Sequence, residues 1–256
     1  MEELLAGRQA VREALKAGRP LHKILIAEGT KGALLNEIQF LAKERGVPVL
    51  KVERKALDRL SRTAPHQGVV ALAAAKEYAE LEDLIKATQA QEEPAFLVML
   101  DGVEDPQNLG AILRLADACG VQGVIIPRRR SAGLSAAVAR ASAGALEYVP
   151  VARVTNLHQA VDTLREAGMW IIGAEGDGET LAFEADFTVP LVLILGGEGK
   201  GLSPLLRKHC DLVVRLPLLG HVTSLNVAAA AAALFYEVVR QRKFPSGREE
   251  ELGKEN

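Results

Sequence analysis

The sequence predicts an α/β protein in which a small α/β domain precedes a larger domain with a parallel sheet and helices on both faces. Two observations support this prediction. Beyond residue 94, continuous apolar runs alternate with helical patterns, which is typical of parallel strands buried on both faces. In addition, 256 residues exceed what one compact core usually needs. We therefore expect a first domain at 1–76, a linker at 77–93, a second domain at 94–243 and a disordered tail at 244–256.

The first domain shows a regular alternation of helix and strand patterns. Residues 8–17 predict a helix and residues 21–27, LHKILIA, a strand. The amphipathic stretch GALLNEIQFLAKERG predicts a second helix, which ends at Gly46. A strand (VPVLKV), a short helix (RKALDRLS) and another strand (GVVALAAA) complete the unit. An acidic stretch that ends in Pro94, which suits a linker or a linking helix, then separates this unit from the rest of the chain.

The second domain is expected to consist of βα repeats that end in an alanine-rich helix. Its first predicted strand is AFLVMLDG, followed by the helix NLGAILRLADACG and the strand VQGVIIP. Further predicted segments are, in order, LSAAVARASAGA, YVPVAR, NLHQAVDTLREAG, MWIIGAE, LVLILGG, SPLLRKHC, DLVVRLP and the alanine helix. Continuous apolar strands separated by helices predict a parallel sheet that is covered on both faces.

The composition excludes membrane and disulfide-stabilised classes of protein. Hydrophobic residues make up 48% and charged residues 25%, and no apolar run reaches the roughly 18–20 residues that span a bilayer. The start, MEELLAGRQAVREALKAG, has the pattern of a charged amphipathic helix and lacks that of a signal peptide. Cys119 and Cys210 lie far apart, which favours neither a disulfide framework nor a zinc site. We expect a cytoplasmic protein.

The charges are distributed unevenly along the chain. The formal net charge is −2. Residues 1–75 nevertheless carry 13 Lys and Arg against 8 Asp and Glu, a net charge of +5, which leaves −7 for the remainder. A nearly neutral total therefore conceals a basic N-terminal third, which is the charge pattern of a nucleic-acid contact.

The first candidate site is a glycine-rich loop after a buried strand, LVLILGGEGKGLSP at 191–204. Glycines in this position let a backbone approach a ligand closely. A Walker phosphate loop is excluded because Ile194 and Gly201 occupy the places of a glycine and a hydroxyl residue, and a dinucleotide fingerprint meets Leu202 at its last place. A flexible turn is the alternative, but Glu198 has no structural reason to stand among four glycines.

The second candidate site is DGVEDPQNLGAILRLADACG at 101–120. A strand ends here, and Asp105, Pro106 and Asn108 lead into a helix that contains Arg114. Each residue also has an ordinary explanation, because Asn108 is a good N-cap and Arg114 suits a solvated helix flank.

The third candidate site is the polar turn before the alanine helix, GHVTSLNVAAAAAALFYE at 220–237. Ser224 or Asn226 would cap the helix well, and alanine favours helix by propensity alone. A helix with so little polar surface is expected to be buried on most sides, with small residues that let another backbone approach. One face carries Val227, Ala231, Leu234 and Val238.

Taken together and in this order, the three segments resemble the SpoU branch of the SPOUT methyltransferases, which transfer a methyl group from S-adenosylmethionine to a ribose 2′-hydroxyl of tRNA or rRNA. The motifs are DPQNLGAILRLADACG, LILGGEGKGLSP and LPLLGHVTSLNVA, and the resemblance covers nearly the whole chain. The N-terminal part, with HQGVVA at 66–71, is similar to the family's ribosomal-protein-like RNA-binding domain. Within the family, the closest resemblance is to bacterial enzymes that methylate a guanosine of 23S rRNA.

The resemblance implies a C-terminal deep trefoil knot, an exception to the general absence of knots in proteins. It also implies that S-adenosylmethionine binds in that knot through backbone groups. Glycines and aliphatic side chains suit this cofactor, because adenine requires an apolar slot and main-chain hydrogen bonds. The matching positions are Gly196, Gly197, Glu198, Gly199, Leu216, Pro217, Leu225 and Asn226.

The resemblance further implies catalytic roles for Arg114, Asn108, Glu198, Ser224 and Asn226. Because a guanidinium stays protonated in proteins, we expect Arg114 to hold the adjacent phosphate and stabilise developing alkoxide charge. Glu198 would orient Arg114. The remaining three residues would fix the reacting ribose and the knot loops.

RNA is the expected partner, and a homodimer packed through the alanine helix is the expected assembly, with neither a membrane nor a metal partner. The basic first domain would capture the RNA, together with a run of arginines in the second domain. The expected RNA contacts are Arg8, His66, Arg128, Arg129, Arg130 and Arg140.

Three alternatives remain open at this point. In the first alternative, the enzyme methylates tRNA. In the second, the chain is a non-catalytic RNA-binding factor of ribosome assembly, although binding alone would not require Asn108, Arg114, Glu198 and Asn226 together. A Rossmann-type oxidoreductase, the third, is disfavoured by the spacing of the glycines.

Overall fold

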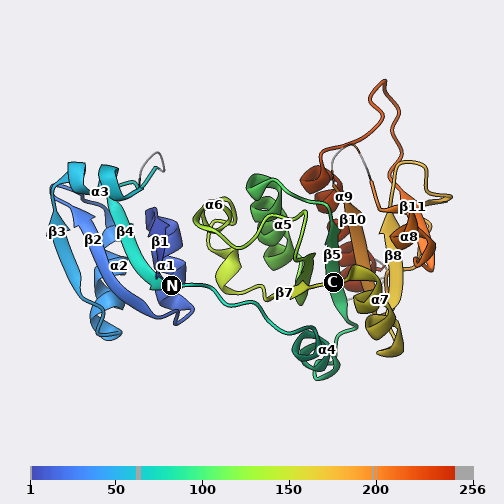
Figure 1. The fold of residues 1–256 in the computed structure, drawn as a ribbon, viewed down its shortest axis with the longest axis horizontal. Helices are drawn as coiled ribbons and strands as arrows, with labels where there is room; N and C mark the ends of the chain where they lie inside the picture. Colours follow the sequence, from blue (N-terminus) through green and yellow to red (C-terminus); the bar gives the residue numbers. More distant parts are fainter. Residues whose placement is uncertain (1, 62–64, 198, 200, 246–256) are drawn as a thin grey trace, which may run out of the picture.

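The computed structural model describes residues 2–61, 65–197, 199 and 201–245, and it shows two domains joined by an extended segment (Figure 1). The first domain has a four-stranded sheet in the order β1-β4-β2-β3, in which only β2 and β3 are parallel. Its elements are β1 (Glu2–Ala6), α1 (Arg8–Lys16), β2 (Leu21–Ala27), α2 (Ala33–Glu44), β3 (Val49–Val52), α3 (Arg54–Ser61) and β4 (Val69–Ala74).

The expectation that the chain starts as one amphipathic helix is wrong for its first residues. Residues 2–6 form the edge strand β1, which pairs antiparallel with β4. The helix cannot extend back through Gly7, because its φ of 111° lies in the region that favours glycine. The remaining elements predicted for this domain are confirmed within a few residues.

The second domain has a seven-stranded sheet in the order β7-β6-β5-β10-β8-β11-β9, and all of its strand pairs are parallel. The helices are α4 (Leu81–Gln89), α5 (Pro106–Ala118), α6 (Ala136–Ala141), α7 (Leu157–Glu166), α8 (Pro204–Lys208) and α9 (Val227–Lys243), with the 3-10 helix η1 at Ala145–Glu147. The strands are β5 (Phe96–Asp101), β6 (Gly123–Pro127), β7 (Val151–Val154), β8 (Trp170–Ala174), β9 (Thr180–Leu181), β10 (Leu191–Gly196) and β11 (Leu212–Arg215).

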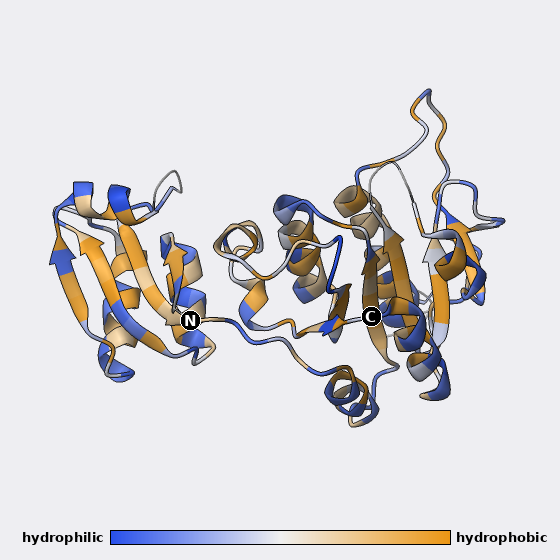
Figure 2. Cartoon of the chain, viewed as in Figure 1, coloured by the Kyte–Doolittle hydropathy of each residue, from blue (hydrophilic) through white to orange (hydrophobic). Residues whose placement is uncertain are grey.

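Alternating side chains of the central strands bury both faces of this sheet. On β5, Phe96 and Val98 share a buried cluster with residues of α5 and α9. The intervening Leu97 and Met99 belong to a second cluster, which contains residues of α4 and α7. Figure 2 shows the strands as continuous apolar segments, with polar residues on the outer sides of the helices. The prediction of a parallel sheet with helices on both faces is confirmed.

Part of the segment expected to link the domains belongs to the second core. Helix α4 spans Leu81–Gln89, and its Leu81, Leu84 and Ile85 are buried. The acidic residues that suggested a linker lie on its exposed side, as Glu82 and Asp83 do in the first turn. The extended connection between the domains is therefore shorter than the composition suggests.

Charged side chains join the two domains where α1 and β1 meet α6 and η1. The Arg19 side chain is 5% exposed and makes ion pairs with Glu3 of its own domain and with Glu147 of the second domain, the latter at 2.8 Å. The Tyr148 hydroxyl donates to the Glu13 carboxylate at 2.7 Å. Gly144 permits this approach, because a Cβ there would lie 2.3 Å from Cγ of Glu13.

Candidate functional site

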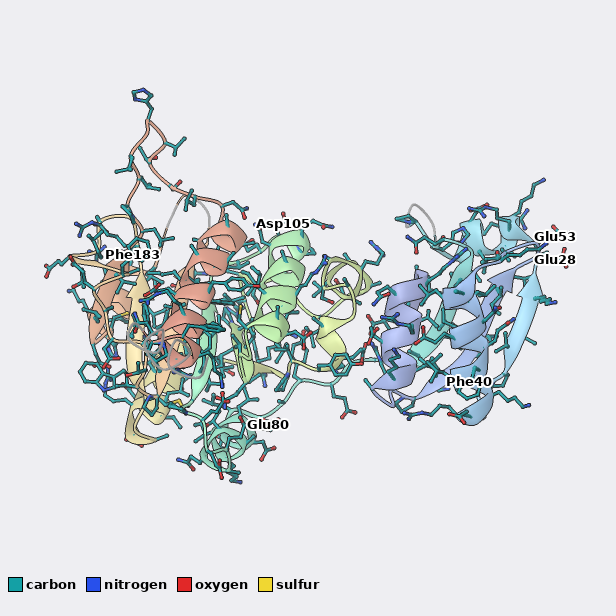
Figure 3. All side chains as sticks on the ribbon, turned by 180° about the vertical axis from the view of Figure 1, so that it is seen from behind. Glu28, Phe40, Glu53, Glu80, Asp105 and Phe183 are labelled. Carbon is teal, nitrogen blue, oxygen red and sulfur yellow. The ribbon has the colours of Figure 1, made fainter. Side chains whose placement is uncertain are left out.

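The candidate site lies at the carboxyl ends of the central strands, where ligands of open α/β sheets bind. Four loops meet at this edge, because β5, β10, β8 and β11 are neighbours and parallel. They are 102–105, 197–203, 175–179 and 216–226. Figure 3 shows Asp105 at the start of α5, at the same end of the domain as the protruding loop 216–226.

Two glycines of the second motif are required by the approach of neighbouring backbones. A Cβ on Gly196 would lie 2.2 Å from the carbonyl carbon of Gly201, and one on Gly197 would lie 2.1 Å from the carbonyl oxygen of Gly102. The amide of Gly197 donates to the carbonyl of Asp101 at 2.7 Å, which ties the end of β10 to the end of β5. These glycines therefore bring the two loops together.

A large cavity of about 900 Å³ opens beside the glycine-rich loop. Of the predicted cofactor residues, Gly196, Gly197, Gly199, Leu216 and Leu225 line it, and Ser224 lies with them. Pro217 and Asn226 directly follow the lining residues Leu216 and Leu225 in sequence, but they do not line the cavity themselves. Glu198 lies outside the described residues. The cavity has the size and mixed lining of a small-molecule site.

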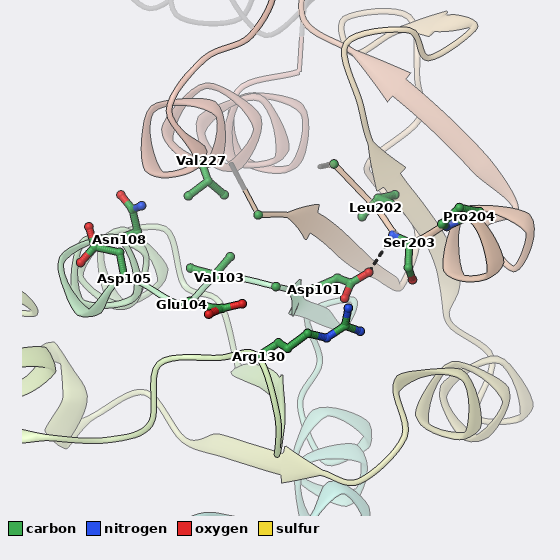
Figure 4. A pocket seen from close by; sticks show the side chains of 13 residues that line it. Asp101, Val103, Glu104, Asp105, Asn108, Arg130, Leu202, Ser203, Pro204 and Val227 are labelled. Atoms are coloured by element: carbon green, nitrogen blue, oxygen red, sulfur yellow. Dashed lines mark hydrogen bonds between the residues drawn. The ribbon is translucent and has the colours of Figure 1, made fainter. Parts of the chain in front are cut away.

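A small cavity of about 440 Å³ adjoins the large one. The two share Gly197, Gly201, Leu202, Pro204 and Val227. Its other lining residues come from the end of β5, the start of α5, the loop after β6 and the start of α8: Asp101, Gly102, Val103, Glu104, Asp105, Asn108, Arg130 and Ser203. Figure 4 shows Glu104 and Arg130 entering it from different loops.

The structure joins the first and third motifs by a direct hydrogen bond. Nδ2 of Asn226 donates to Oδ1 of Asn108 at 2.9 Å, across 118 residues of sequence. The Oδ1 of Asn226 also accepts from the amides of Ala228 and Ala229, so this residue caps α9. Asn108 is in the first turn of α5, whose cap is instead Asp105. The two asparagines therefore fix the starts of two helices that border the cavities.

Arg114 lies apart from both cavities of its own chain. It is on the exposed surface of α5, and neither cavity is lined by it. Within the described part of the chain, its guanidinium makes neither a hydrogen bond nor an ion pair. Asn108 and Arg114 lie on the same helix, but they do not reach the same cavity. Asn108 lines the small cavity, whereas Arg114 lines neither cavity.

The predicted RNA contacts fall into two groups. Arg8 and His66 are engaged within the first domain, because Arg8 donates to the carbonyl of Gln67 at 3.0 Å and both ring nitrogens of the 5% exposed His66 have partners. Those partners are a carboxylate oxygen of Asp58 and the amide of Gly68. In the second domain, Arg128, Arg129 and Arg130 are exposed and Arg140 is half-buried.

Three charged residues of the large cavity were missed by the sequence reasoning. Glu175 follows the carboxyl end of β8, where its Oε1 accepts from the amide of Leu202 at 2.6 Å. Its other oxygen pairs with Arg207, which also pairs with Asp177 at 2.6 Å. The hydrogen bond from Arg207 lowers the pKa of Asp177 below its ordinary value. The place of Glu175 just after a buried strand is the signal that could have found it.

A group of basic side chains on β3 and α3 was also missed. It consists of Lys51, Arg54, Lys55 and Arg59, all of which are exposed. None of them forms an ion pair with another residue in the described ranges. We call this group the α3 basic patch. Figure 1 shows α3 on the side of the molecule to which loop 216–226 projects.

Few other kinds of site are present among the described residues. Among the described residues, no group of three or more His, Cys, Asp and Glu side chains is placed to hold a metal ion. No helix in the described ranges has the length and apolar character needed to cross a membrane. Cys119 and Cys210 are both free thiols, and burial raises the pKa of each, to about 11 for Cys210.

Comparison with known families assigns each domain. The family described as RNA 2′-O ribose methyltransferase substrate binding matches residues 4–79. The SpoU rRNA Methylase family matches residues 95–236. These two matches correspond to the two domains of the structure and together span most of the chain.

Individual relatives agree with this assignment. YacO of Bacillus subtilis, named for the TrmH family of tRNA/rRNA methyltransferases, is 45% identical over 240 residues, which are 94% of this chain and 96% of that protein. The SpoU methyltransferase AviRb of Streptomyces viridochromogenes, solved with AdoMet, is 29% identical with a TM-score of 0.78 and covers 94% of this chain and 90% of its own.

An AdoMet-bound rRNA methyltransferase of Sinorhizobium meliloti is 27% identical, with a TM-score of 0.79 over 95% of this chain and 88% of that one. Two solved relatives thus hold the cofactor that the sequence motifs predict for the family. The match of the family over more than half of the chain and the identity to YacO lead to one conclusion. The chain belongs to the SpoU/TrmH family of tRNA/rRNA methyltransferases.

Proposed function

We propose that this protein transfers a methyl group from S-adenosylmethionine to a ribose 2′-hydroxyl of RNA. The observation that carries the proposal is the hydrogen bond between Asn108 and Asn226, which joins the first and third motifs where two cavities adjoin. A transferase needs adjoining sites for donor and acceptor. The family that matches the first domain is described by the same reaction class.

The large cavity is the proposed cofactor site. Gly199 has a φ of 78°, and a Cβ added there would meet nothing within 4 Å, so there is open space beside its Cα atom. Leu216 and Leu225 supply apolar walls for adenine. The bound cofactor supplies an electrophilic methyl group. We also propose that the loops around this cavity form the trefoil knot that the family resemblance implies.

Positioning is the main task of the protein's own residues. A ribose hydroxyl is a weak nucleophile at neutral pH, so it must be held in line with the methyl group while its proton leaves. Ser224 lies in the large cavity and Asn108 in the small one, on either side of the proposed reaction centre. Arg114 would bind the neighbouring phosphate and stabilise developing charge on the oxygen, and Glu198 would orient it.

We infer that Arg114 acts in the site of a second copy. In its own chain it is exposed on α5 and lines neither cavity. Helix α9, which packs beside α5, presents an exposed face with Ala229, Ala233 and Tyr236, and the two alanines permit close packing of a second chain. A homodimer formed through α5 and α9 would bring Arg114 to the partner's cavities.

Mixed dimers test this assignment. Chains with different affinity tags, one with Arg114→Ala and the other with Ser224→Ala, are co-expressed and the mixed dimer is purified. Each mixed dimer then contains one site with both residues intact and one site that lacks both. It should retain about half of the wild-type methyl transfer, although both parent dimers are inactive. An inactive mixed dimer would instead assign Arg114 to its own chain.

We propose rRNA as the substrate and a guanosine of 23S rRNA as the target. The α3 basic patch and the arginines after β6 offer exposed cations to phosphates. The test is transfer of a labelled methyl group into rRNA and tRNA from cells that lack the enzyme, followed by mapping of the modified position. Label in tRNA alone would favour the tRNA alternative, and the absence of label from both would favour a non-catalytic RNA-binding role.

A further inference from the structure

The small cavity has a lining that the cofactor does not explain. Its volume of about 440 Å³ falls within the range of ligand pockets. It adjoins the large cavity through Gly197, Gly201 and Val227, so its occupant would lie directly beside the proposed cofactor. Under the proposed function, on which this inference rests, that occupant is the nucleotide whose ribose accepts the methyl group.

Two of the three carboxylates that line the cavity have structural roles. The Oδ2 of Asp101 accepts from the amide of Ser203 at 2.8 Å, which holds the start of α8 against the end of β5. The Oδ1 of Asp105 accepts from the amide of Gln107 at 2.9 Å and caps α5. These bonds account for their presence at the edge of the sheet.

Glu104 has no such role. It is exposed, and it makes neither a hydrogen bond nor an ion pair with any residue in the described ranges. Figure 4 shows its carboxylate inside the cavity, beside neither Asp105 nor Asn108. A carboxylate is an acceptor with two oxygens, so Glu104 offers the cavity a pair of acceptors that none of the described residues uses.

Arg130 enters the same cavity from the loop after β6. Its φ of 54° is one of the few positive values at a residue other than glycine. Such backbone conformations cost free energy and are found where the surrounding structure imposes them, often at ligand sites. The amide of Ala132 donates to the carbonyl of Val103 at 2.8 Å, so the loop of Arg130 is fixed to the loop of Glu104. Within the described part of the chain, Arg130 also lacks a hydrogen bond or ion pair.

We propose that the small cavity receives the base of the target nucleotide and that Glu104 selects guanine. Guanine is the RNA base that presents two adjacent donors, N1–H and N2–H, on its Watson–Crick edge. A carboxylate accepts both at once, whereas the corresponding edges of adenine, cytosine and uracil each place an acceptor beside the donor. Arg130 stacks on the base or holds its phosphate, as guanidinium groups do in RNA recognition. Glu104 is therefore a specificity-determining residue.

The probes of this proposal are the four nucleoside 5′-monophosphates, titrated by calorimetry into the full chain saturated with S-adenosylhomocysteine. Wild type should prefer guanosine monophosphate, and Glu104→Gln should weaken that nucleotide alone by about 10-fold, the effect expected when a bidentate hydrogen-bonded pair is removed. The matched control is Glu53→Gln, an exposed glutamate of the first domain. Equal binding of the four nucleotides to wild type, or equal weakening of all four in Glu104→Gln, would overturn the proposal.

A second pair of variants tests the role of Arg130. Arg130→Gly removes the guanidinium but suits the positive φ, so the loop keeps its path. It should weaken all four nucleotides to a similar extent, because neither stacking nor a phosphate contact reads the base edge. Lys86→Gln is the control, since the side chain of Lys86 is 76% exposed on α4 and lines neither cavity. An equal loss of affinity in the two variants would contradict the role of Arg130.

Methyl-transfer assays separate failure of this inference from failure of the proposed function. The base preference of Glu104→Gln is compared with that of wild type on RNA. A wild-type enzyme that methylates ribose, with a base preference that Glu104→Gln leaves unchanged, would overturn the inference and keep the function. Failure of the wild type to methylate RNA, with selective binding of guanosine monophosphate intact, would overturn the function and keep the base pocket.

Discussion

Charged side chains at the domain junction differ in burial and pairing from those at the carboxyl edge of the sheet. At the junction, Arg19 is nearly buried and is paired with Glu3 and with Glu147. At the edge, Glu104 and Arg130 are exposed and lack partners within the described residues. Burial makes pairing obligatory, because an unpaired charge in the interior loses its hydration without compensation. Charges left unpaired beside cavities are the ones available to a ligand.

The two groups of charged residues have different roles: one fixes the domains, and the other is available to bind RNA. The junction pairs fix the basic first domain against the second domain, through residues that never need to touch RNA. The α3 basic patch and the arginines after β6 are the groups that remain available to phosphates. We therefore expect substitutions at the junction to act on stability and substitutions at the edge to act on binding and transfer.

The largest expected effect is on stability, at the junction. Arg19→Met leaves Glu147, whose side chain is 4% exposed, with Lys76 as its only charged partner among the described residues, at 3.5 Å. Breaking a buried pair in this way costs about 3–5 kcal/mol, measured as a decrease in the free energy of unfolding by urea. The control is Lys16→Met, which removes a 2.8 Å pair with Glu37 at a side chain 40% exposed and should cost at most about 1 kcal/mol. Equal costs would contradict the comparison.

The second effect is on methyl transfer, at the edge. Asn226→Asp keeps an oxygen that accepts from Ala228 and Ala229, but it removes the donor to Asn108. We expect transfer to fall about 100-fold, by analogy with the loss of one positioned donor, while the melting temperature hardly changes.

The matched control for that variant is Asn156→Asp, because Asn156 caps α7 in the same way, through the amide of His158 at 2.9 Å. It should leave transfer unchanged. A normal rate in Asn226→Asp, or an equal loss in Asn156→Asp, would show that the hydrogen bond between the two motifs is only structural.

The third effect is on the salt dependence of RNA binding. Replacement of Arg54 and Lys55 by Gln removes two unpaired cations from the α3 basic patch. The slope of log K against log salt should become shallower by about 1 for each phosphate that the variant no longer neutralises. Lys86→Gln, at a side chain 76% exposed on α4, is the control. Unchanged slopes in the double variant would remove the patch from the RNA-binding surface.

The smallest effect is a pH dependence at the junction. Burial alone would raise the pKa of Glu13, but hydrogen bonds from Tyr148 and Arg12 outweigh it and hold the pKa below 4.5. The contribution to stability is therefore present above pH 4.5 and is lost as pH falls through the lowered pKa.

Tyr148→Phe tests this dependence, because it removes the hydroxyl that donates to Glu13. It should cost about 1 kcal/mol at neutral pH, and the difference from wild type should shrink in acid, as followed by urea unfolding. The control is Thr163→Val, which removes a hydroxyl that donates to the carbonyl of Gln159 at 3.0 Å, so its cost should not change with pH. A cost of Tyr148→Phe that did not change with pH would assign it to packing.

Much of the fold could be predicted from the sequence because strand and helix periods are local. The apolar runs of the second domain became buried parallel strands, as on β5, where both faces are covered. The edge strand β1 was missed, because five residues before a helix carry no signal of pairing with β4. Helix α4 was assigned to a linker because its acidic face hides the buried Leu84.

The segments that form the site could be predicted from the sequence, but their arrangement in space could not. Motif order indicated Asn108 and Asn226, yet only the fold shows that they share a hydrogen bond. The large cavity contains the predicted Gly196 and Leu225. Glu175 and the α3 basic patch were missed, because an acidic residue after a strand or a basic helix becomes significant only when the topology brings its neighbours beside it.

The most direct test of the central claim is the chemical position of the transferred methyl group. RNA labelled by the wild-type protein is hydrolysed completely in alkali, which requires a free 2′-hydroxyl beside each bond that is cleaved. A methyl group on the ribose oxygen protects the neighbouring bond, so the label should appear in an alkali-stable dinucleotide. Label found only in mononucleotides would place the methyl group on a base and would contradict the proposed reaction.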